Sequence, residues 1–434
     1  MKKIVKVSIY AAAFSAMLAV PPMVSLIPGV DVATAHAETK TKRVPALREK
    51  VYSQLARAQK LADDGDVKGG LEALDSVKER MGSMNAYEIA MMYNFYGFIY
   101  YNQNQLPKAI EAFEQVIAQD AIPETLALST TFSLAQLAMA NEQYEKVIDY
   151  LNDWDKINTK PKADNYYVLK SQAFYQMKDY KNALENIEIA INLTEAKNEI
   201  PNENWLVLQR ALYYSMNQPA KVVTVLEKMV KLYNKPVYWV QLGGMYGEVG
   251  EEKKQLAILE SAKQQGFIKT KSDFQQLAQA YLMSGLPFKS ASTYSKGLKE
   301  GVIENSAKNN AFIAEAFVQA KEDQKAVPYF IAAAKVTDNG KYDQRLAEVY
   351  IGLEKYELAA DATRAALEKG GLDSESNAYV ALGMAQYNLQ NFDASILAFE
   401  QAEKHKRSQR LAQQWIKYVK SEKLHAETLR TALL

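Results

Sequence analysis

From residue 51 to residue 405 the chain repeats one arrangement of small, aromatic and polar positions every 33 to 39 residues. Each copy has one position that is small in nine of the ten copies, and an aromatic residue often follows it three residues later. The first position is occupied by Ala58, Gly97, Ala135, Ser171, Arg210, Gly243, Ala278, Ala314, Ala347 and Gly383. The aromatic residues are Tyr100, Phe174, Tyr213, Tyr246, Tyr281, Phe317 and Tyr350. The pattern predicts about ten copies of one structural unit.

Each unit is predicted to be a pair of antiparallel helices. A small residue lets the first helix approach the second closely, and the aromatic residue fills the space beside it. Small residues in the second half of the units, such as Ala109, Ala183, Ala326 and Ala359, allow the reciprocal approach. A single pair has too much apolar surface to stand alone, so the pairs must stack. The fold class is therefore all-α, a right-handed α-solenoid of about ten helix pairs.

Turn signals agree with this division. Gly- and Asn-containing turns such as 64–66, 102–104 and 249–251 fall between the two helices of a unit. Prolines at 123, 161, 201 and 236 fall between units, where a helix must stop. Two units are irregular, because Arg210 replaces the small residue of the fifth unit and Val147 replaces an expected Ala in the third.

The unit resembles the tetratricopeptide repeat (TPR). Trp239, Leu242, Gly243 and Tyr246 reproduce the W-x2-L-G-x2-Y opening of its first helix. The A-x3-F element of its second helix is present as Ala109 with Phe113 and as Ala326 with Phe330. The resemblance covers about residues 48–405 and implies a scaffold that binds proteins or peptides.

The two ends of the chain differ from the repeats. Lys2, Lys3 and Lys6 precede an apolar run from residue 7 to 20, and Ala35-His36-Ala37 forms a small-residue exit site. This order is typical of an export signal, so we expect residues 1–37 to be a cleaved signal peptide, with a retained anchor as the alternative. Residues 38–50 are predicted to be a linker and residues 406–434 a capping helix. We expect a periplasmic location and no membrane span in the mature chain.

Composition narrows the classes of function. The 52 Lys and Arg nearly balance the 51 Asp and Glu, so the chain has no overall field to hold a nucleic acid. It has no cysteine, which excludes disulfides, thiolate metal sites and a Cys nucleophile.

Candidate catalytic chemistry is sparse. Gly243, Gly244, Gly247 and Gly250 resemble a phosphate-binding loop, but the preceding strand that such a loop needs is not predicted. Two histidines follow residue 37, and no G-x-S-x-G motif is present. Glu422 and His425 have helical metal-site spacing, but a second copy of the motif is missing. We therefore predict no enzyme activity, no metal and no cofactor.

The first-helix positions that face away from the second helix are predicted to line a concave groove. They are positions two, five, nine, twelve and thirteen, counted so that the small residue is the eighth. These positions are rich in amides and Tyr and poor in charge, which suits an extended peptide or a partner helix. The candidate partner-binding residues are Asn94, Phe98, Tyr101, Asn102, Gln172, Tyr175, Gln176, Tyr214, Gln275, Gln279, Gln319, Gln344, Tyr387 and Asn388, with Met384 beside them.

A narrower resemblance rests on three segments of the N-terminal third, residues 44–48, 84–88 and 94–101. They are similar to exported TPR proteins that accompany TonB, ExbB and ExbD energy transduction systems in gammaproteobacteria. That likeness implies a periplasmic accessory of TonB-dependent uptake. The alternative is an assembly factor for peptidoglycan or exported polysaccharide, since TPR solenoids also serve such machines.

Overall fold

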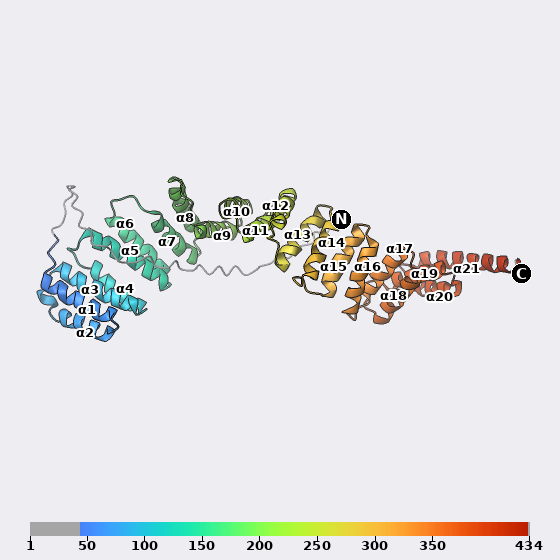
Figure 1. Ribbon diagram of the computed structural model, residues 1–434, viewed down its shortest axis with the longest axis horizontal. Coiled ribbons are helices and arrows are strands. Elements are labelled where there is room, and N and C mark those ends of the chain that lie inside the picture. The colour runs from blue at the N-terminus through green and yellow to red at the C-terminus, as the bar shows by residue number, and fades with distance from the viewer. Residues whose placement is uncertain (1–43, 433–434) are drawn as a thin grey trace. The chain divides into compact units, whose positions relative to one another are not determined.

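The computed structural model describes residues 44–432, so the predicted signal peptide and residues 38–43 of the predicted linker lie outside the described residues. The described chain is all-α, as expected, and divides into two compact units at Leu212 and Tyr213 (Figure 1). Helix α9 (Glu203–Ser215) crosses this boundary. The first unit holds α1 (Glu49–Asp63), α2 (Val67–Lys78), α3 (Ala86–Asn102), α4 (Leu106–Ile117), α5 (Glu124–Ala140), α6 (Tyr144–Ile157), α7 (Asp164–Gln176) and α8 (Tyr180–Glu195), with a short 3₁₀ turn at Met81–Ser83.

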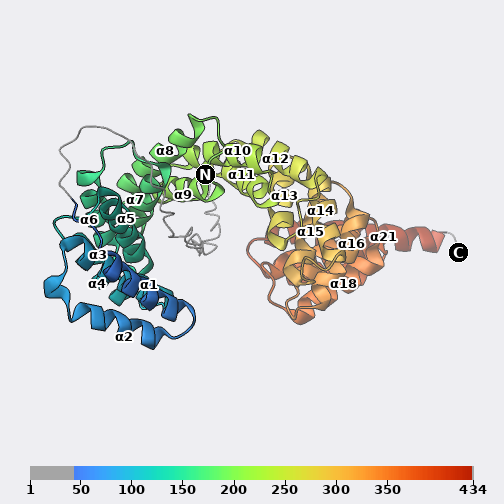
Figure 2. The same cartoon turned by 60° about the vertical axis from the view of Figure 1, so that its left-hand side comes forward.

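The second unit continues the same alternation of helices. It holds α10 (Pro219–Tyr233), α11 (Pro236–Glu248), α12 (Glu252–Gln264), α13 (Lys271–Met283), α14 (Pro287–Lys299), α15 (Ala307–Gln319), α16 (Asp323–Lys335), α17 (Lys341–Gly352), α18 (Tyr356–Lys369), α19 (Glu375–Asn388), α20 (Phe392–Glu403) and α21 (Gln409–Ala432). Figure 2 shows its helices following one another in chain order. We call the odd-numbered helices α1 to α19 the A helices and the even-numbered helices α2 to α20 the B helices.

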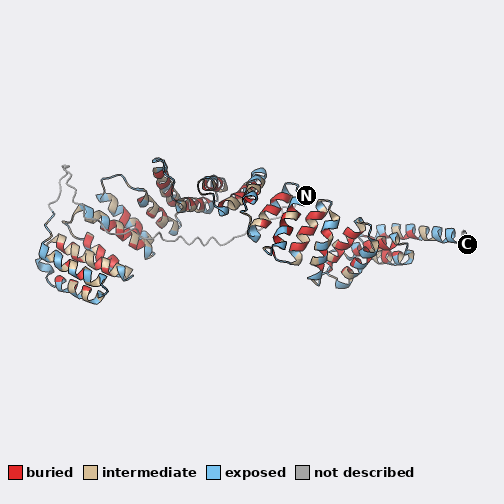
Figure 3. Cartoon of the chain, in the orientation of Figure 1, coloured by how far each residue is buried: buried red, intermediate tan, exposed pale blue. Residues whose placement is uncertain are grey.

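The ten predicted helix pairs are confirmed, and so is their register. Each small-residue position of the sequence pattern lies in an A helix, and each is buried. Arg210 is also buried at this position, in α9, so the fifth pair is in the predicted phase. Val147 of the third pair is fully buried in B helix α6. Figure 3 shows the buried residues on the faces where helices pack together.

Glycine is required at this position where the B helix presents a bulky side chain. A Cβ built on Gly97 would lie 2.6 Å from the Phe113 ring, and one on Gly383 would lie 2.7 Å from the Phe399 ring. Both distances are shorter than van der Waals contact, so even a methyl group would displace a ring. The phenylalanine of the B helix therefore explains the glycine of the A helix in these two pairs.

All ten turns inside the pairs have the same construction. Three residues separate the A helix from its B helix, and the middle residue has a positive φ. The N–H of that residue and the next N–H bond back to two carbonyls of the A helix, as in Asn104 to Tyr101 O and Gln105 to Tyr100 O. This is the Schellman arrangement that satisfies the last carbonyls of a helix. The middle residues are Gly65, Asn104, Glu142, Lys178, Asn217, Gly250, Gly285, Lys321, Glu354 and Gln390.

The differences in repeat length come from the connections between pairs and also from the helices, since α3 and α5 have 17 residues whereas α7 has 13. The expectation that longer loops between pairs explain the longer repeats is therefore correct only in part. The connection from a B helix to the next A helix ranges from two residues, after α10, to seven, after α2, α8 and α14. Pro123 and Pro236 stand at the starts of α5 and α11, and Pro161 and Pro201 lie in connections. A proline at these sites cannot interrupt the hydrogen bonds of a helix interior.

Tyrosine–carboxylate hydrogen bonds connect consecutive pairs. Tyr96 of α3 donates to Asp75 of α2 at 2.5 Å, and Tyr166 of α7 donates to Asp155 of α6 at 2.6 Å. In the second unit Tyr246 of α11 donates to Glu227 of α10 at 2.6 Å. Each bond joins an A helix to the preceding B helix. Hydrogen bonds to a charged acceptor are stronger than neutral ones, so these contacts fix the stacking of the pairs.

The segment before α1 is bound to the start of α3. The Arg48 guanidinium donates to both oxygens of Glu88, at 2.6 Å each, and the amide of Asn85 donates to Ala46 O at 3.0 Å. Glu88 is fully buried and also completes a capping box with Asn85. The Arg48 hydrogen bonds hold the pKa of Glu88 at about 2. Residues 44–48 and 84–88, two of the segments behind the narrower resemblance, therefore form one contact.

Helix α21 packs on the last B helix. The Trp415 ring stacks on Phe399 with centroids 5.3 Å apart, and Ala412, Ile416 and Val419 are buried. Side chains from 424 to 430 are exposed. No helix of the described chain is long and apolar enough to cross a membrane.

Candidate protein-binding face

Some A helices lie beside another A helix of the same unit. Helix α1 contacts α3 in the first unit, and α11 contacts α13 and α17 contacts α19 in the second. We call the sides of the A helices that point away from the B helices the A face of each unit. The A face contains the positions from which the sequence predicted a groove.

In the first unit the candidates lie on α3 and α7. Asn94, Phe98 and Tyr101 are half-buried on α3, and Gln172 and Tyr175 are half-buried on α7. Asn102 and Gln176 end these two helices and are exposed.

Two aromatic residues of α3 are half-exposed and also pack against the core. Phe98 packs edge-on against Phe113 of α4, with ring centroids 5.4 Å apart. Phe98 and Tyr101 both pack against the core of the first unit. Their rings therefore have fixed positions, which lowers the conformational entropy lost when a ligand contacts them. The amides of Asn94, Asn102 and Gln172 make no hydrogen bond to another described side chain or backbone group, so their donors and acceptors remain available.

In the second unit several candidates are engaged by the fold. The Gln275 amide donates to the Tyr294 hydroxyl at 3.1 Å, and that hydroxyl donates to Asn309 at 3.1 Å. This chain connects α13, α14 and α15. Gln279 and Gln319 are exposed, and Tyr214 is 58% exposed.

Gln344 is buried, with 9% of its surface exposed. The expectation that it lines an open groove is therefore wrong. It occupies the fifth position of its A helix, which is buried only at Leu55 and Gln344 and is half-buried in the other eight A helices. Neighbouring helices cover it, and α17 contacts α16, α18 and α19.

Tyr387 is covered by α21. Its hydroxyl lies 2.9 Å from the Tyr418 hydroxyl, and its ring centroid is 5.8 Å from that of Trp415. The hydrogen bond to Tyr418, with burial, raises the pKa of Tyr387 to about 12. Met384 packs in the same aromatic cluster, and Asn388 bonds back to Met384 O at 2.8 Å. These residues hold α21 in place, a role that their own repeat did not indicate.

The expectation that the A face is poor in charge is wrong over α15 and α17. Glu315 and Glu348 occupy the ninth position of these helices, and Arg345 lies between them. Arg345 donates two bonds of 2.7 Å to Glu315 and also pairs with Glu348. Hydrogen bonding to Glu315 raises the pKa of Arg345 further above its usual value. Sequence spacing could have found this group, because residues 345 and 348 are one helical turn apart.

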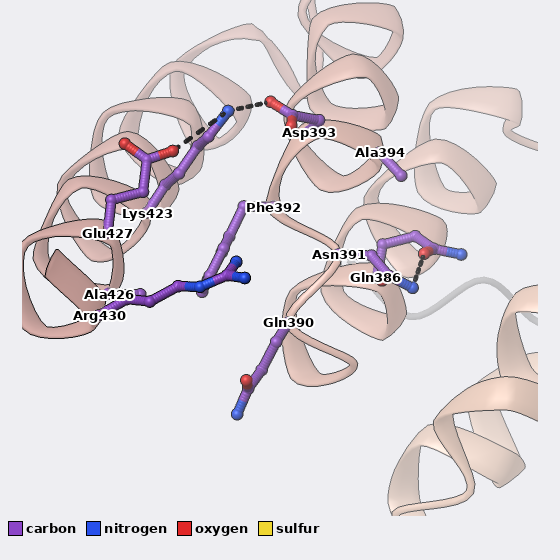
Figure 4. Close-up of a pocket in the computed structure, with 10 residues that line it drawn as sticks. All are labelled: Gln386, Gln390, Asn391, Phe392, Asp393, Ala394, Lys423, Ala426, Glu427 and Arg430. Carbon is purple, nitrogen blue, oxygen red and sulfur yellow. Dashed lines mark hydrogen bonds and ion pairs between the residues drawn. The ribbon is translucent and has the colours of Figure 1, made fainter. Parts of the chain in front are cut away.

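A cavity of about 520 Å³ lies between α21 and the turn from α19 to α20 (Figure 4). Lys423 reaches Asp393 at 2.5 Å across it, and the Asn391 amide donates to Gln386 at 3.0 Å. Figure 4 shows the Arg430 guanidinium beside Phe392. The mixed charges and open shape give no single ligand chemistry. Sequence reasoning missed these residues because they meet only when α21 folds back along α20.

The glycine cluster has packing roles. Gly243, Gly244 and Gly247 all lie inside α11, and Cβ atoms there would lie 2.4–2.6 Å from side chains of Leu259, Gln276 and Gln255. Gly250 is the positive-φ residue of the following turn. Among the described residues no group of His, Asp and Glu could hold a metal ion.

Comparisons with known proteins agree with this geometry. The tetratricopeptide repeat family model matches residues 90–122 and 376–407, which cover most of α3 with all of α4 and nearly all of α19 with all of α20. No curated protein sequence matches the chain.

Three solved structures illustrate the similarity. YrrB, described as a TPR protein with an unusual peptide-binding site, is 14% identical, with 44% of this chain and 97% of that chain covered and a TM-score of 0.36. A TPR protein from Parabacteroides merdae is 13% identical, with 67% and 94% covered and a TM-score of 0.35. The C-terminal part of a TPR repeat-containing protein from Cytophaga hutchinsonii is 17% identical, with 57% and 97% covered and a TM-score of 0.40.

Two pairs match the family model, and the other eight repeat their A helix, three-residue turn and B helix in the same register. The described chain is thus an all-α array of TPR-like helix pairs.

Proposed function

We propose that this protein is an exported scaffold that binds an extended peptide or a partner helix along the A face of its first unit. One observation carries the proposal: α3 and α7 present half-exposed aromatic rings beside amides that the described chain leaves without partners. Amides can bond both the N–H and the C=O groups of an extended backbone, and tyrosine gives contact area at low entropy cost. A protein or peptide partner is what a TPR scaffold is expected to have.

Photo-cross-linking tests the proposed face. A benzophenone amino acid replaces Tyr101 or Tyr175 on the A face, and Tyr144 at the start of B helix α6 serves as control because it is half-buried like the other two. We expect one discrete adduct in the cell envelope from both A-face positions and none from Tyr144. The same adducts from all three positions, or from Tyr144 alone, would refute the A-face proposal.

We further propose that the scaffold works in the periplasm. The basic head, the apolar run from 7 to 20 and the Ala35-His36-Ala37 site support export. Mass spectrometry of the protein purified from its host tests cleavage, and we expect the mature chain to begin at Glu38. A chain that keeps residues 1–37 and sediments with membranes would support the retained anchor instead.

The finer proposal is an accessory of TonB-dependent uptake. It rests on the resemblance of residues 44–48, 84–88 and 94–101 to TPR proteins of TonB systems. We expect the Tyr101 and Tyr175 adducts to contain TonB, ExbB or ExbD, and a deletion strain to lose iron-chelate uptake. Intact uptake together with an altered wall or exported polymer would instead favour the cell-envelope assembly role.

A further inference from the structure

A second cavity, of about 350 Å³, lies between B helices of the sixth and seventh pairs. Its floor is formed by Phe274 and Leu277 of α13 and by Ile268 of the connection before that helix. Lysines of α12 and α14 stand around it. None of the proposed binding residues of the A face lines this cavity, so it is a separate site.

One ammonium group at this cavity, that of Lys263, has only neutral hydrogen-bond partners. Lys263 Nζ lies 3.4 Å from the Thr293 hydroxyl and 3.5 Å from the Tyr281 hydroxyl. It also lies over the Tyr281 ring, 5.4 Å from the centroid. Burial lowers the pKa of Lys263, attraction to Glu260 offsets part of this effect, and repulsion from Lys289 and Lys296 adds to it. The site thus holds a positive charge that a bound anion would stabilise.

The other two lysines are paired. Lys289 Nζ lies 2.7 Å from Glu260, and Lys296 Nζ lies 3.7 Å from Glu300. Three ammonium groups therefore face two carboxylates. Glu260 is bonded directly to Lys289 and attracts Lys263 from a greater distance, so Lys263 is the least neutralised of the three ammonium groups.

The rest of the cavity is apolar. Phe274 and Leu277 are buried, and Ile268 is half-buried. Phe288 forms a wall and is 44% exposed, while its ring is held by Phe317 at a centroid distance of 6.0 Å. An apolar ligand group on this floor would remove exposed aromatic surface from water.

We propose that this cavity binds a small amphipathic carboxylate, with its apolar group on Phe274, Ile268 and Phe288 and its carboxylate on Lys263. Ligand pockets span roughly 300–1,000 Å³, so a cavity of about 350 Å³ holds one phenyl or branched alkyl group. The same chemistry is offered by a free organic acid and by the last residue of a peptide that ends in an aromatic or aliphatic side chain.

Titration of the purified protein with 3-phenylpropionate tests the site, with 3-phenylpropionamide as the matched neutral ligand. We expect saturable binding with a dissociation constant on the order of 1 mM for so small a ligand. The amide should bind about tenfold more weakly, because the charge-assisted hydrogen bond to Lys263 is lost. Equal affinity for the acid and the amide, or no saturation at all, would overturn the proposal.

Variants test whether the ligand binds in this cavity. Lys263→Gln should weaken binding about tenfold, and Ser292→Phe should abolish it by filling the cavity that Ser292 lines. Lys253→Gln is the matched control, because Lys253 is an exposed lysine of the same helix that does not line the cavity. Circular dichroism establishes that each variant is folded. Unchanged affinity in both Lys263→Gln and Ser292→Phe would exclude this cavity.

Peptides separate the two sources of ligand. Gly-Gly-Phe with a free carboxylate is compared with Gly-Gly-Phe amide and with 3-phenylpropionate. Tighter binding of the free peptide than of the acid assigns the site to peptide C-termini, and binding of the acid alone assigns it to small organic acids. Either result supports the site, whereas preferential binding of the peptide amide contradicts it.

Discussion

Two kinds of residue decide whether an A helix can meet its B helix. The first is the small residue at the eighth position, which sets the distance between the two helices. The second is the middle residue of the turn, which must adopt a left-handed backbone conformation and is glycine in only three of the ten pairs. Side chains with a Cβ pay an energetic penalty in this conformation, so the other seven turns contain strain that the surrounding helices hold.

The contact between Gly97 and Phe113 predicts that adding a single methyl group at residue 97 destabilises the fold. Gly97→Ala should lower the free energy of unfolding by about 1–3 kcal/mol, because the buried Phe113 ring must move. Gly82→Ala is the control, since a Cβ there has no atom within 4 Å. Urea unfolding followed by circular dichroism measures both variants. Equal stability of the two would show that the helices can separate without cost.

The turn at Lys178 predicts that a glycine substitution increases stability. Its φ is 62°, so Lys178→Gly should raise the free energy of unfolding by about 0.5–1 kcal/mol. Glu185→Gly in the interior of α8 should lower it by about 1 kcal/mol. Thermal unfolding of the two variants measures whether their stabilities change in opposite directions. A loss of stability in both variants would argue against left-handed strain in the turn.

At the scale of elements, the turns inside pairs are constant and the connections between pairs vary. The segment before α1 adds a separate element, because Arg48 and Asn85 bind it to the start of α3. A buried carboxylate paired with a cation is ionised in the folded state at a pH where the unfolded chain takes up a proton. This contact therefore links the stability of the first pairs to acid pH.

Glu88 has a folded-state pKa of about 2, below its ordinary value. A depressed pKa contributes stability above the unfolded pKa, and that contribution is lost as pH falls toward the folded value. Glu88→Gln should therefore be less stable than the natural protein at pH 7, by about 1–2 kcal/mol because Arg48 is partly exposed.

The difference in the free energy of unfolding between the natural protein and Glu88→Gln should shrink as pH falls from near 4.5 to near 2. Urea unfolding at several pH values measures it, and Glu72→Gln on the exposed face of α2 is the control. A difference that stays constant with pH would mean that the ionised Glu88 does not stabilise the fold.

The local sequence pattern predicted the helix pairs, but it did not predict which of their residues other helices cover. Spacing predicted ten pairs in register, including the pair that contains Arg210, because each small position packs against its own B helix. It did not predict that Tyr387 would be covered, because α21 lies far along the chain. It also gave no sign that Gln344 is buried, since burial at the fifth position depends on neighbouring helices.

At the scale of the whole molecule, the described chain forms two compact units that differ in their A faces. In the first unit the A face carries aromatic rings and unpaired amides. In the second, hydrogen bonds through Gln275, the Arg345 ion pairs and the Tyr387 cluster engage the corresponding positions. A partner that needs open amides and aromatic area is therefore expected on the first unit.

The most direct test is to map where a captured partner lies along this face. Phe98, Gln136 and Gln172 occupy the ninth position of α3, α5 and α7. Packed helices lie about 8–10 Å apart and an extended chain advances about 3.3 Å per residue, so adducts from consecutive positions should fall about three partner residues apart. Benzophenone at each position, followed by peptide mass spectrometry, measures that spacing. Adducts in order along one partner segment are the predicted result, and adducts scattered over the partner or absent from all three positions would contradict binding along the A face.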